Sequence, residues 1–241
     1  MTIAERLQTI AENEQKIFEI GKLEGESLMW DAIQDFGKRN NYSYAFCGWG
    51  LEYLHPKYKI APTYRESLNQ IFSNSLKLKK IEGKYFDFSN KQDGSGQDSC
   101  YWTFGASTVL EEIEDIGISA PTGYYSAFNS CLALHTIAVV RSHENTSFSG
   151  TFGYCYALKN VTFEGLIGQN ISMSYSSKLS KASMQSLINA LATTSTGKTV
   201  TLSLTAVNTA FETSTGAKDG SESAEWLALR ETKSNWTIST I

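Results

Sequence analysis

A repeat of 24 residues in the middle of the chain restricts its fold more than any other feature. Between residues 67 and 165, four segments share one template: a Phe, a small residue three positions later, an aliphatic residue six later and a β-branched residue nine later. A fifth matched column lies four positions before each Phe. In chain order the segments are Leu68, Phe72, Ser75, Leu78, Ile81; Cys100, Phe104, Ser107, Leu110, Ile113; Tyr124, Phe128, Cys131, Leu134, Ile137; and Phe148, Phe152, Cys155, Leu158, Val161. A hydrophilic insertion around residues 91–97 lengthens the first interval and is typical of a surface loop.

The template indicates a stack of short parallel strands. Within each unit, Leu-x-x-Ile-x-apolar places alternate residues on one side of a strand, and the Phe closes the back of the core. One unit cannot bury both faces, but stacking at about 4.8 Å turns each column into a continuous ladder. A 24-residue period lies in the range of leucine-rich repeats. The predicted fold class is therefore an α/β repeat solenoid, a short leucine-rich repeat stack over residues 67–178.

Two copies carry a resemblance to a known family. Residues 127–137, AFNSCLALHTI, and residues 151–161, TFGYCYALKNV, resemble the AFxxCxxLxxI signature of BspA-like leucine-rich repeats. The first two copies depart by having Ser in place of Cys, and no copy has the Ile-Pro that often follows the last strand residue. The resemblance implies a right-handed solenoid used for binding, in a family found in bacterial surface proteins and gut phages and prophages, with few enzymes. Residues 3–14 and 235–239 also resemble the ends of repeat proteins from phages of gut Firmicutes.

The regions before the repeats are of two kinds. Residues 1–29 predict an N-terminal helix with a heptad-like apolar seam of Ile3, Leu7, Ile10 and Ile17. Two interpretations are open: the helix packs on its own domain, or it forms a short parallel coiled coil that joins copies into a homo-oligomer, with a trimer favoured. Residues 30–66 are rich in aromatics and predict an irregular collar over the end of the stack.

The region after the repeats, residues 179–241, predicts an α+β C-terminal cap. Ser180 can N-cap a helix whose apolar face is Met184, Leu187, Ile188 and Leu191. A strand over 199–204, a helical turn over 206–211, a helix over 222–230 and a strand over 236–238 follow. Such a cap would shield the open edge of the stack from pairing with other chains.

Composition excludes several functions. The net charge is −4, and no cluster of Lys and Arg offers a footprint for nucleic acid. No apolar run reaches the roughly 20 residues needed to insert in a membrane, and the polar start predicts no secretory signal. Four Cys are too few for a disulfide framework. Cys131 and Cys155 fit small buried positions in neighbouring repeats, and whether any Cys pair is oxidised stays open.

The sequence offers little chemistry, so we expect no enzyme activity, cofactor or metal site. The acidic residues Glu111, Glu112 and Glu114 lie opposite Lys79 and Lys80 of the preceding repeat, which favours cross-strand charge pairing on an exposed face. No phosphate loop, nucleophile elbow or catalytic triad spacing is present in the sequence.

The most informative exposed positions are aromatic. Residues two or three positions before the Phe column, and two or four after it, need not be buried, and they include Tyr101, Trp102, Tyr125, Tyr154 and Tyr156. Tyr and Trp are enriched at recognition surfaces, although these rings could instead pack on the cap or the insertion loop.

Two functions remain. The first is a non-catalytic phage tail-associated or host-attachment structural protein of the virion, which binds a bacterial surface receptor or glycan and other virion proteins. The alternative is a bacterial cell-surface adhesin or protein-binding scaffold. The polar start, which predicts no secretory signal, favours the virion protein, because an adhesin needs export.

Overall fold

A computed structural model describes residues 47–48, 53–54, 69–84, 100–115, 123–212 and 223–241. The chain divides into two compact units, Met1–Arg39 and Asn40–Ile241, and all described residues belong to the second. The predicted seam of Ile3, Leu7, Ile10 and Ile17 lies outside the described residues. So do most of the predicted collar and the insertion around residues 91–97.

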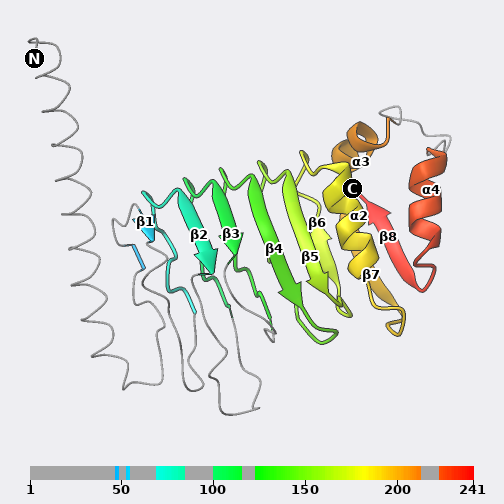
Figure 1. The fold of residues 1–241 in the computed structure, drawn as a ribbon, viewed down its shortest axis with the longest axis horizontal. Helices are drawn as coiled ribbons and strands as arrows, with labels where there is room; N and C mark the ends of the chain where they lie inside the picture. The colour runs from blue at the N-terminus through cyan, green and yellow to red at the C-terminus, as the bar shows by residue number, and fades with distance from the viewer. Residues whose placement is uncertain (1–46, 49–52, 55–68, 85–99, 116–122, 213–222) are drawn as a thin grey trace, which may run out of the picture. The chain divides into compact units, whose positions relative to one another are not determined.

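The repeat segments supply four strands of a five-stranded parallel sheet whose order follows the chain, and the first strand comes from the predicted collar (Figure 1). The strands are β1 (Tyr53–Leu54), β2 (Lys80–Lys84), β3 (Glu112–Asp115), β4 (Thr136–Ser142) and β5 (Asn160–Gly165). Ile81 pairs with Ile113, Ile113 with Ile137, and Ile137 with Val161. The β-branched column of the template is therefore one continuous row of the sheet, buried on its inner face.

The predicted Phe column is confirmed as a stack of buried rings. Phe72, Phe104, Phe128 and Phe152 follow one another at centroid distances of 5.8 Å, with interplanar angles of 22° or less. Tyr124 and Phe148, from the column four positions earlier, stack beside them at 5.6 Å. These rings fill the space behind the sheet, so each repeat completes the core of its neighbours. Assignment of this stack to the leucine-rich repeat class stays a prediction.

The turns that carry the Phe residues form a second hydrogen-bonded ladder. The backbone N–H of Phe72 donates to Thr103, that of Phe104 to Ala127 and that of Phe128 to Thr151, at 2.8 to 3.1 Å. Residues two before and two after each Phe have positive φ angles, between 51° and 67°. These eight residues are Gln70, Asn74, Trp102, Ala106, Ser126, Ser130, Gly150 and Tyr154. One turn geometry therefore repeats four times, although only one of the eight residues is the Gly that this region favours.

The column of small residues, three positions after each Phe, has a role that residue size alone does not explain. Ser107 Oγ donates to the carbonyl of Phe72 at 2.9 Å. Cys131 Sγ donates to that of Phe104, and Cys155 Sγ to that of Phe128, both at 3.1 Å. Three of the four members are thus buried donors, which explains why Ser and Cys exchange there, whereas the Ser75 hydroxyl is buried without a partner.

A helix takes the place of a further strand beside β5. Helix α2 (Lys181–Ala190) begins after Ser180, whose side chain accepts from the N–H of Ser183, and buries Met184, Leu187 and Ile188. The predicted capped helix is confirmed. On its face toward the sheet, Ser183 Oγ accepts from the N–H of Val161 at 2.8 Å and Ser186 Oγ from that of Phe163 at 2.9 Å. Two serine hydroxyls therefore satisfy donors that the sheet edge would otherwise leave open.

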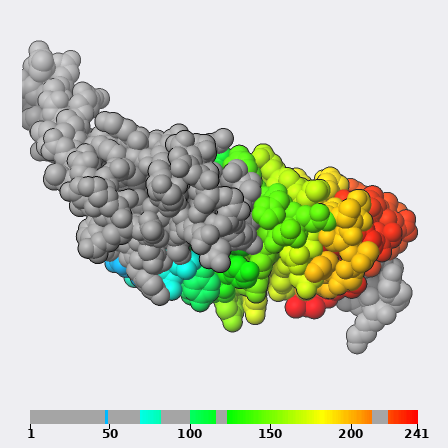
Figure 2. All heavy atoms as spheres, turned by 90° about the horizontal axis from the view of Figure 1, so that it is seen from below, coloured from blue at the N-terminus to red at the C-terminus, as the bar shows by residue number. Residues whose placement is uncertain are grey.

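The remaining strands form a second parallel sheet in the order β6 (Ile171–Met173), β7 (Lys198–Leu202) and β8 (Trp236–Thr240). Helices α3 (Leu204–Ala210) and α4 (Ala224–Glu231) lie between β7 and β8 in the chain. The strand predicted over 199–204 ends earlier in the structure, because Ser203 is the N-cap of α3 and Leu204 is its first residue. Strand β6 falls in the range predicted for the repeats, yet it pairs with β7. Figure 2 shows the described segments following one another in chain order, from green through yellow to red.

Candidate functional site

Three tyrosines form a cluster of exposed rings at the end of the last repeat. The centroids of Tyr154 and Tyr175 are 4.6 Å apart, those of Tyr156 and Tyr175 5.9 Å and those of Tyr154 and Tyr156 6.1 Å. Each residue is 43 to 48% exposed. The pKa of Tyr175 is raised, first by the neighbouring Tyr154. The rings contact one another at interplanar angles of 36° to 85°, and we call this exposed cluster the tyrosine platform.

The other predicted site residues lie apart from this cluster. Tyr101 and Tyr125 are exposed, by 44 and 39%, at equivalent positions of adjacent turns. Trp102 is half-buried, and its indole covers Gly105 so closely that a Cβ at that position would overlap the ring. Among the described residues, no ring contact joins these three aromatics to one another or to Tyr154. The five predicted residues thus belong to two groups, and the structure joins Tyr154 and Tyr156 to Tyr175, which the sequence analysis missed.

A polar hollow of about 430 Å³ lies beside the last repeat and the second sheet. Three separate segments line it: the turn before Phe152, the start of β6 and the middle of β7. Its lining residues are Ser147, Phe148, Ser149, Gly150, Gln169, Asn170, Ile171, Ser172, Thr199 and Thr201. None of them carries a charge, so the hollow offers hydroxyls and amides without a counter-charge.

The tyrosine cluster lies near this hollow along the chain, and none of its three residues is part of the lining. Ser172 lines the hollow, and Tyr175 follows three residues later. Because consecutive Cα atoms are about 3.8 Å apart, the Cα atoms of these two residues lie within about 11 Å. The platform and the hollow are therefore close enough to contact one extended ligand.

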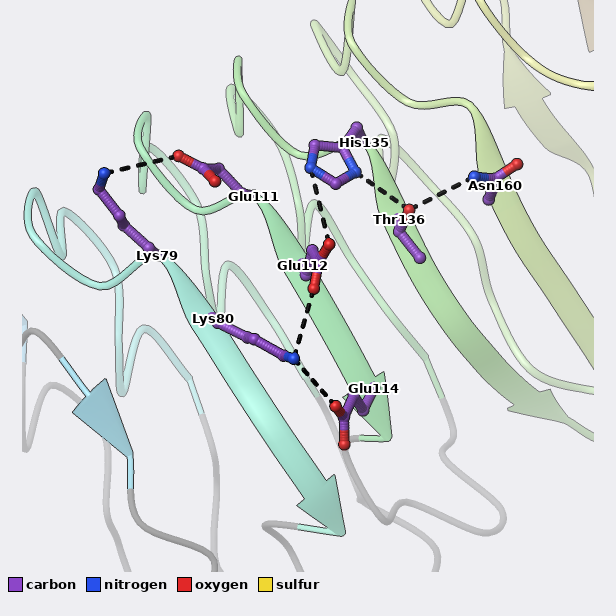
Figure 3. A network of polar contacts seen from close by, with 8 residues as sticks. All are labelled: Lys79, Lys80, Glu111, Glu112, Glu114, His135, Thr136 and Asn160. Carbon is purple, nitrogen blue, oxygen red and sulfur yellow. Dashed lines mark hydrogen bonds and ion pairs between the residues drawn. The ribbon is translucent and has the colours of Figure 1, made fainter.

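A network of charged and polar side chains covers the exposed face of the first sheet (Figure 3). Lys80 lies 3.5 Å from Glu112 and 3.1 Å from Glu114, and Lys79 lies 3.8 Å from Glu111. The predicted cross-strand pairing is confirmed, since the lysines of β2 and its preceding turn face the acids of the next repeat. In the described residues no group of three or more His, Cys, Asp and Glu could hold a metal ion.

Two further residues extend pairing to the later strands. His135 Nε2 lies 3.9 Å from Glu112, and its Nδ1 lies 3.0 Å from Thr136 Oγ1. Arg141 on β4 pairs with Asp115 on β3 at 2.6 Å and with Glu164 on β5 at 3.1 Å. The acidic run is thus compensated strand by strand, which favours a structural role.

The cysteine thiols are free, and burial keeps two of them protonated. Cys100, Cys131 and Cys155 are buried, and Cys47 is half-buried. Burial raises the pKa of Cys155 to about 12 and that of Cys131 well above its usual value. Both therefore remain protonated donors at neutral pH, where a nucleophilic thiol would need a lowered pKa.

Comparison with known proteins gives no relative: no protein-family model, curated protein or solved structure matches the chain. None of the helices in the described ranges is long and apolar enough to cross a membrane.

Proposed function

We propose that this chain is a non-catalytic recognition protein, a phage tail-associated or host-attachment protein that binds a receptor or glycan on a bacterial surface. The observation that carries the proposal is the exposed platform of Tyr154, Tyr156 and Tyr175. It is mounted on a stack of BspA-like leucine-rich repeat type, the class that the sequence resembles.

The platform has the properties of a recognition surface. Tyrosine has two side-chain torsions and a large amphipathic ring, so it contributes contact area at a low cost in conformational entropy. Tyr154 lies in a turn whose carbonyls at Thr151 and Gly153 accept from N–H groups of the preceding repeat, and its backbone has a φ of 57°. Tyr175 restricts Tyr154 further through ring contact. Such preorganised rings lose little freedom on binding.

The chemistry of the other described residues also favours binding over catalysis. The thiols of Cys131 and Cys155 are protonated and donate to carbonyls. The carboxylates of Glu112 and Glu114 are paired with Lys80. These groups have structural partners, whereas the tyrosine faces are available to a ligand.

A cell-binding experiment tests the proposal. Full-length protein carrying a fluorescent label is added to a panel of intestinal Firmicutes and measured by flow cytometry. The variant Tyr154→Ser/Tyr156→Ser/Tyr175→Ser should lose at least about tenfold in affinity, the equivalent of about 1.4 kcal/mol. The control Tyr101→Ser/Tyr125→Ser removes rings of similar exposure away from the platform and should bind as the unchanged chain does.

Equal binding by the platform variant, with an unchanged melting temperature, would contradict the proposal. The genes beside this one separate the virion protein from a cellular adhesin. Tail and holin genes support the first, and a sortase or secretion cassette supports the second.

A further inference from the structure

The second sheet presents two straight rows of neutral hydrogen-bonding side chains. Ser172 pairs in register with Thr201, and Thr201 with Ser239. In the parallel row, Thr199 pairs with Thr237, and Asn170 accepts from the N–H of Thr199 at 2.8 Å. Neighbouring members of a row are one interstrand spacing apart, about 4.8 Å.

The rows are held by the core beneath them. The intervening residues of the three strands point inward and are buried, among them Ile171, Val200 and Ile238. The hydroxyls therefore stand at fixed positions on a pleated surface, and a ligand need not order them. The rows run into the polar hollow, because Asn170, Ser172, Thr199 and Thr201 belong to both.

Several hydroxyls in the hollow are available to a ligand. Within the described part of the chain, the side chains of Ser147, Ser149 and Thr199 make no hydrogen bond, and Ser149 is exposed. Gln169 accepts from Lys198 Nζ at 3.0 Å, which leaves its amide N–H groups as donors. The hollow thus offers both donors and acceptors, as a polyhydroxylated ligand requires.

We propose that the hollow and the tyrosine platform form one binding site for a neutral oligosaccharide. The inference rests on the proposed recognition function and names the ligand class. Hydroxyl and amide groups at one interstrand spacing match successive sugar units of about that length. The tyrosine faces suit the apolar C–H faces of pyranose rings. No lining residue is charged, which favours a neutral ligand, and Lys198 Nζ, which reaches the lining, already donates to Gln169 Oε1.

Two matched variants test the site in the full-length chain. Ser149→Ala/Thr199→Val removes two hydroxyls from the hollow and nearly preserves side-chain shape. Thr237→Val removes a hydroxyl from the same row on β8, outside the hollow. The probe is an immobilised panel of neutral oligosaccharides of glucose, galactose and N-acetylglucosamine, with sulfated and carboxylated counterparts.

We expect the unchanged chain to bind at least one neutral oligosaccharide in preference to its acidic counterpart. The hollow variant should weaken that binding by about tenfold or more, and the Thr237 control by less than about twofold, with all melting temperatures alike. No binding to any neutral member, preference for acidic members, or equal loss in the hollow variant and the control would each overturn the inference.

A second measurement separates this inference from the proposed function. The neutral oligosaccharide that binds in the panel, added in excess as a competitor, should abolish the tyrosine-dependent binding to cells. If cell binding persists in the presence of the competitor and the platform variant does not bind, the protein is a receptor-binding protein but the saccharide site is wrong. If cells are not bound at all, the proposed function fails, and the oligosaccharide panel decides on the site by itself.

Discussion

The two parallel sheets of this chain reach the same strand geometry by different routes. In β2 to β5, each strand arrives with an identical turn, a Phe in one column and a donor in another, so every repeat is held by copies of itself. In β6 to β8, the strands are separated by segments of different length that include α2, α3 and α4. No turn or Phe column recurs there, and the strands match only in the alternation of buried and exposed residues and in the rows of hydroxyl side chains on the outer face.

The difference shows which interactions set the strand register in each sheet. A repeated sequence fixes register several times over, through the rings of Phe104 and Phe128 and through the Ser and Cys donors. The second sheet relies on inward residues such as Val200 and on packing of helices, which permits a different outer face on each strand. The regular part is therefore suited to hold a shape, and the irregular part to present a site.

The largest test of this comparison is removal of one ring from the stack. Phe128→Ala should cost roughly 3–5 kcal/mol of unfolding free energy, because Phe128 contacts rings on both sides and the cavity cannot collapse. Val200→Ala, in the middle strand of the second sheet, should cost about 2 kcal/mol. Urea denaturation measures both. A cost below about 1 kcal/mol for Phe128→Ala would show that the ring column does not hold the register.

The junction between the two sheets is the second test. Ser183→Ala/Ser186→Ala leaves the N–H groups of Val161 and Phe163 without their acceptors. Unpaired buried donors cost about 1–3 kcal/mol each, so a loss of about 3 kcal/mol is expected in urea denaturation.

The control for this test lies on the same helix. Asn189 is exposed near the end of α2, and Asn189→Ala should change stability by less than about 0.5 kcal/mol. Equal stability of the double serine variant and the control would mean that water replaces the two hydroxyls.

The donor column is tested by two substitutions of one residue. Cys131→Ser keeps a donor toward the carbonyl of Phe104, as Ser107 does toward Phe72, whereas Cys131→Ala leaves that carbonyl with the N–H of Ser107 alone. Cys131→Ala should be less stable than Cys131→Ser by about 0.5–1.5 kcal/mol, the net worth of one hydrogen bond. If Ala is the more stable of the two in chemical denaturation, the column requires only small size.

The buried thiols predict a dependence on alkaline pH. The folded pKa of Cys155, about 12, lies above the value of about 8.5 for an exposed thiol. A raised pKa contributes stability that is complete below about pH 8.5 and is lost as the pH rises toward 12. At about pH 9.5 the loss from this thiol is about 1.4 kcal/mol, and Cys155→Ser should remove it. An identical slope in both proteins between about pH 8 and about pH 9.5 would contradict the assignment.

The smallest expected effect concerns the turns. Ala106 has a φ of 59°, in the left-handed region that costs a non-Gly residue about 1 kcal/mol or more. Ala106→Gly should therefore raise stability by about 0.5–1 kcal/mol, after allowance for the freer unfolded chain. The matching Gly150→Ala should lower it, since the added Cβ would meet Ser126 Oγ at 2.7 Å. Thermal unfolding of the two variants should give shifts of opposite sign.

The sequence was sufficient to predict the buried rows of the repeats but not the exposed sites. Ile113, Ile137 and Val161 were predicted as one row because the same residue type recurs at one interval, and a regular stack has only one way to align them. Tyr175 was missed because it lies outside the template. The hollow was missed because residues 147–150, 169–172 and 199–201 become neighbours only through the second sheet.

The sequence by itself determined the parts of this protein that depend on periodicity and local capping. These are the buried Phe column, the strand register of the repeats, and helix α2 with its cap at Ser180. Only the tertiary structure decided that β6 leaves the repeat sheet to pair with β7, and that Tyr154, Tyr156 and Tyr175 meet beside a polar hollow. The physical reason is that periodic burial is encoded within each segment, whereas a surface formed by separate segments depends on how helices and loops of unequal length return the chain.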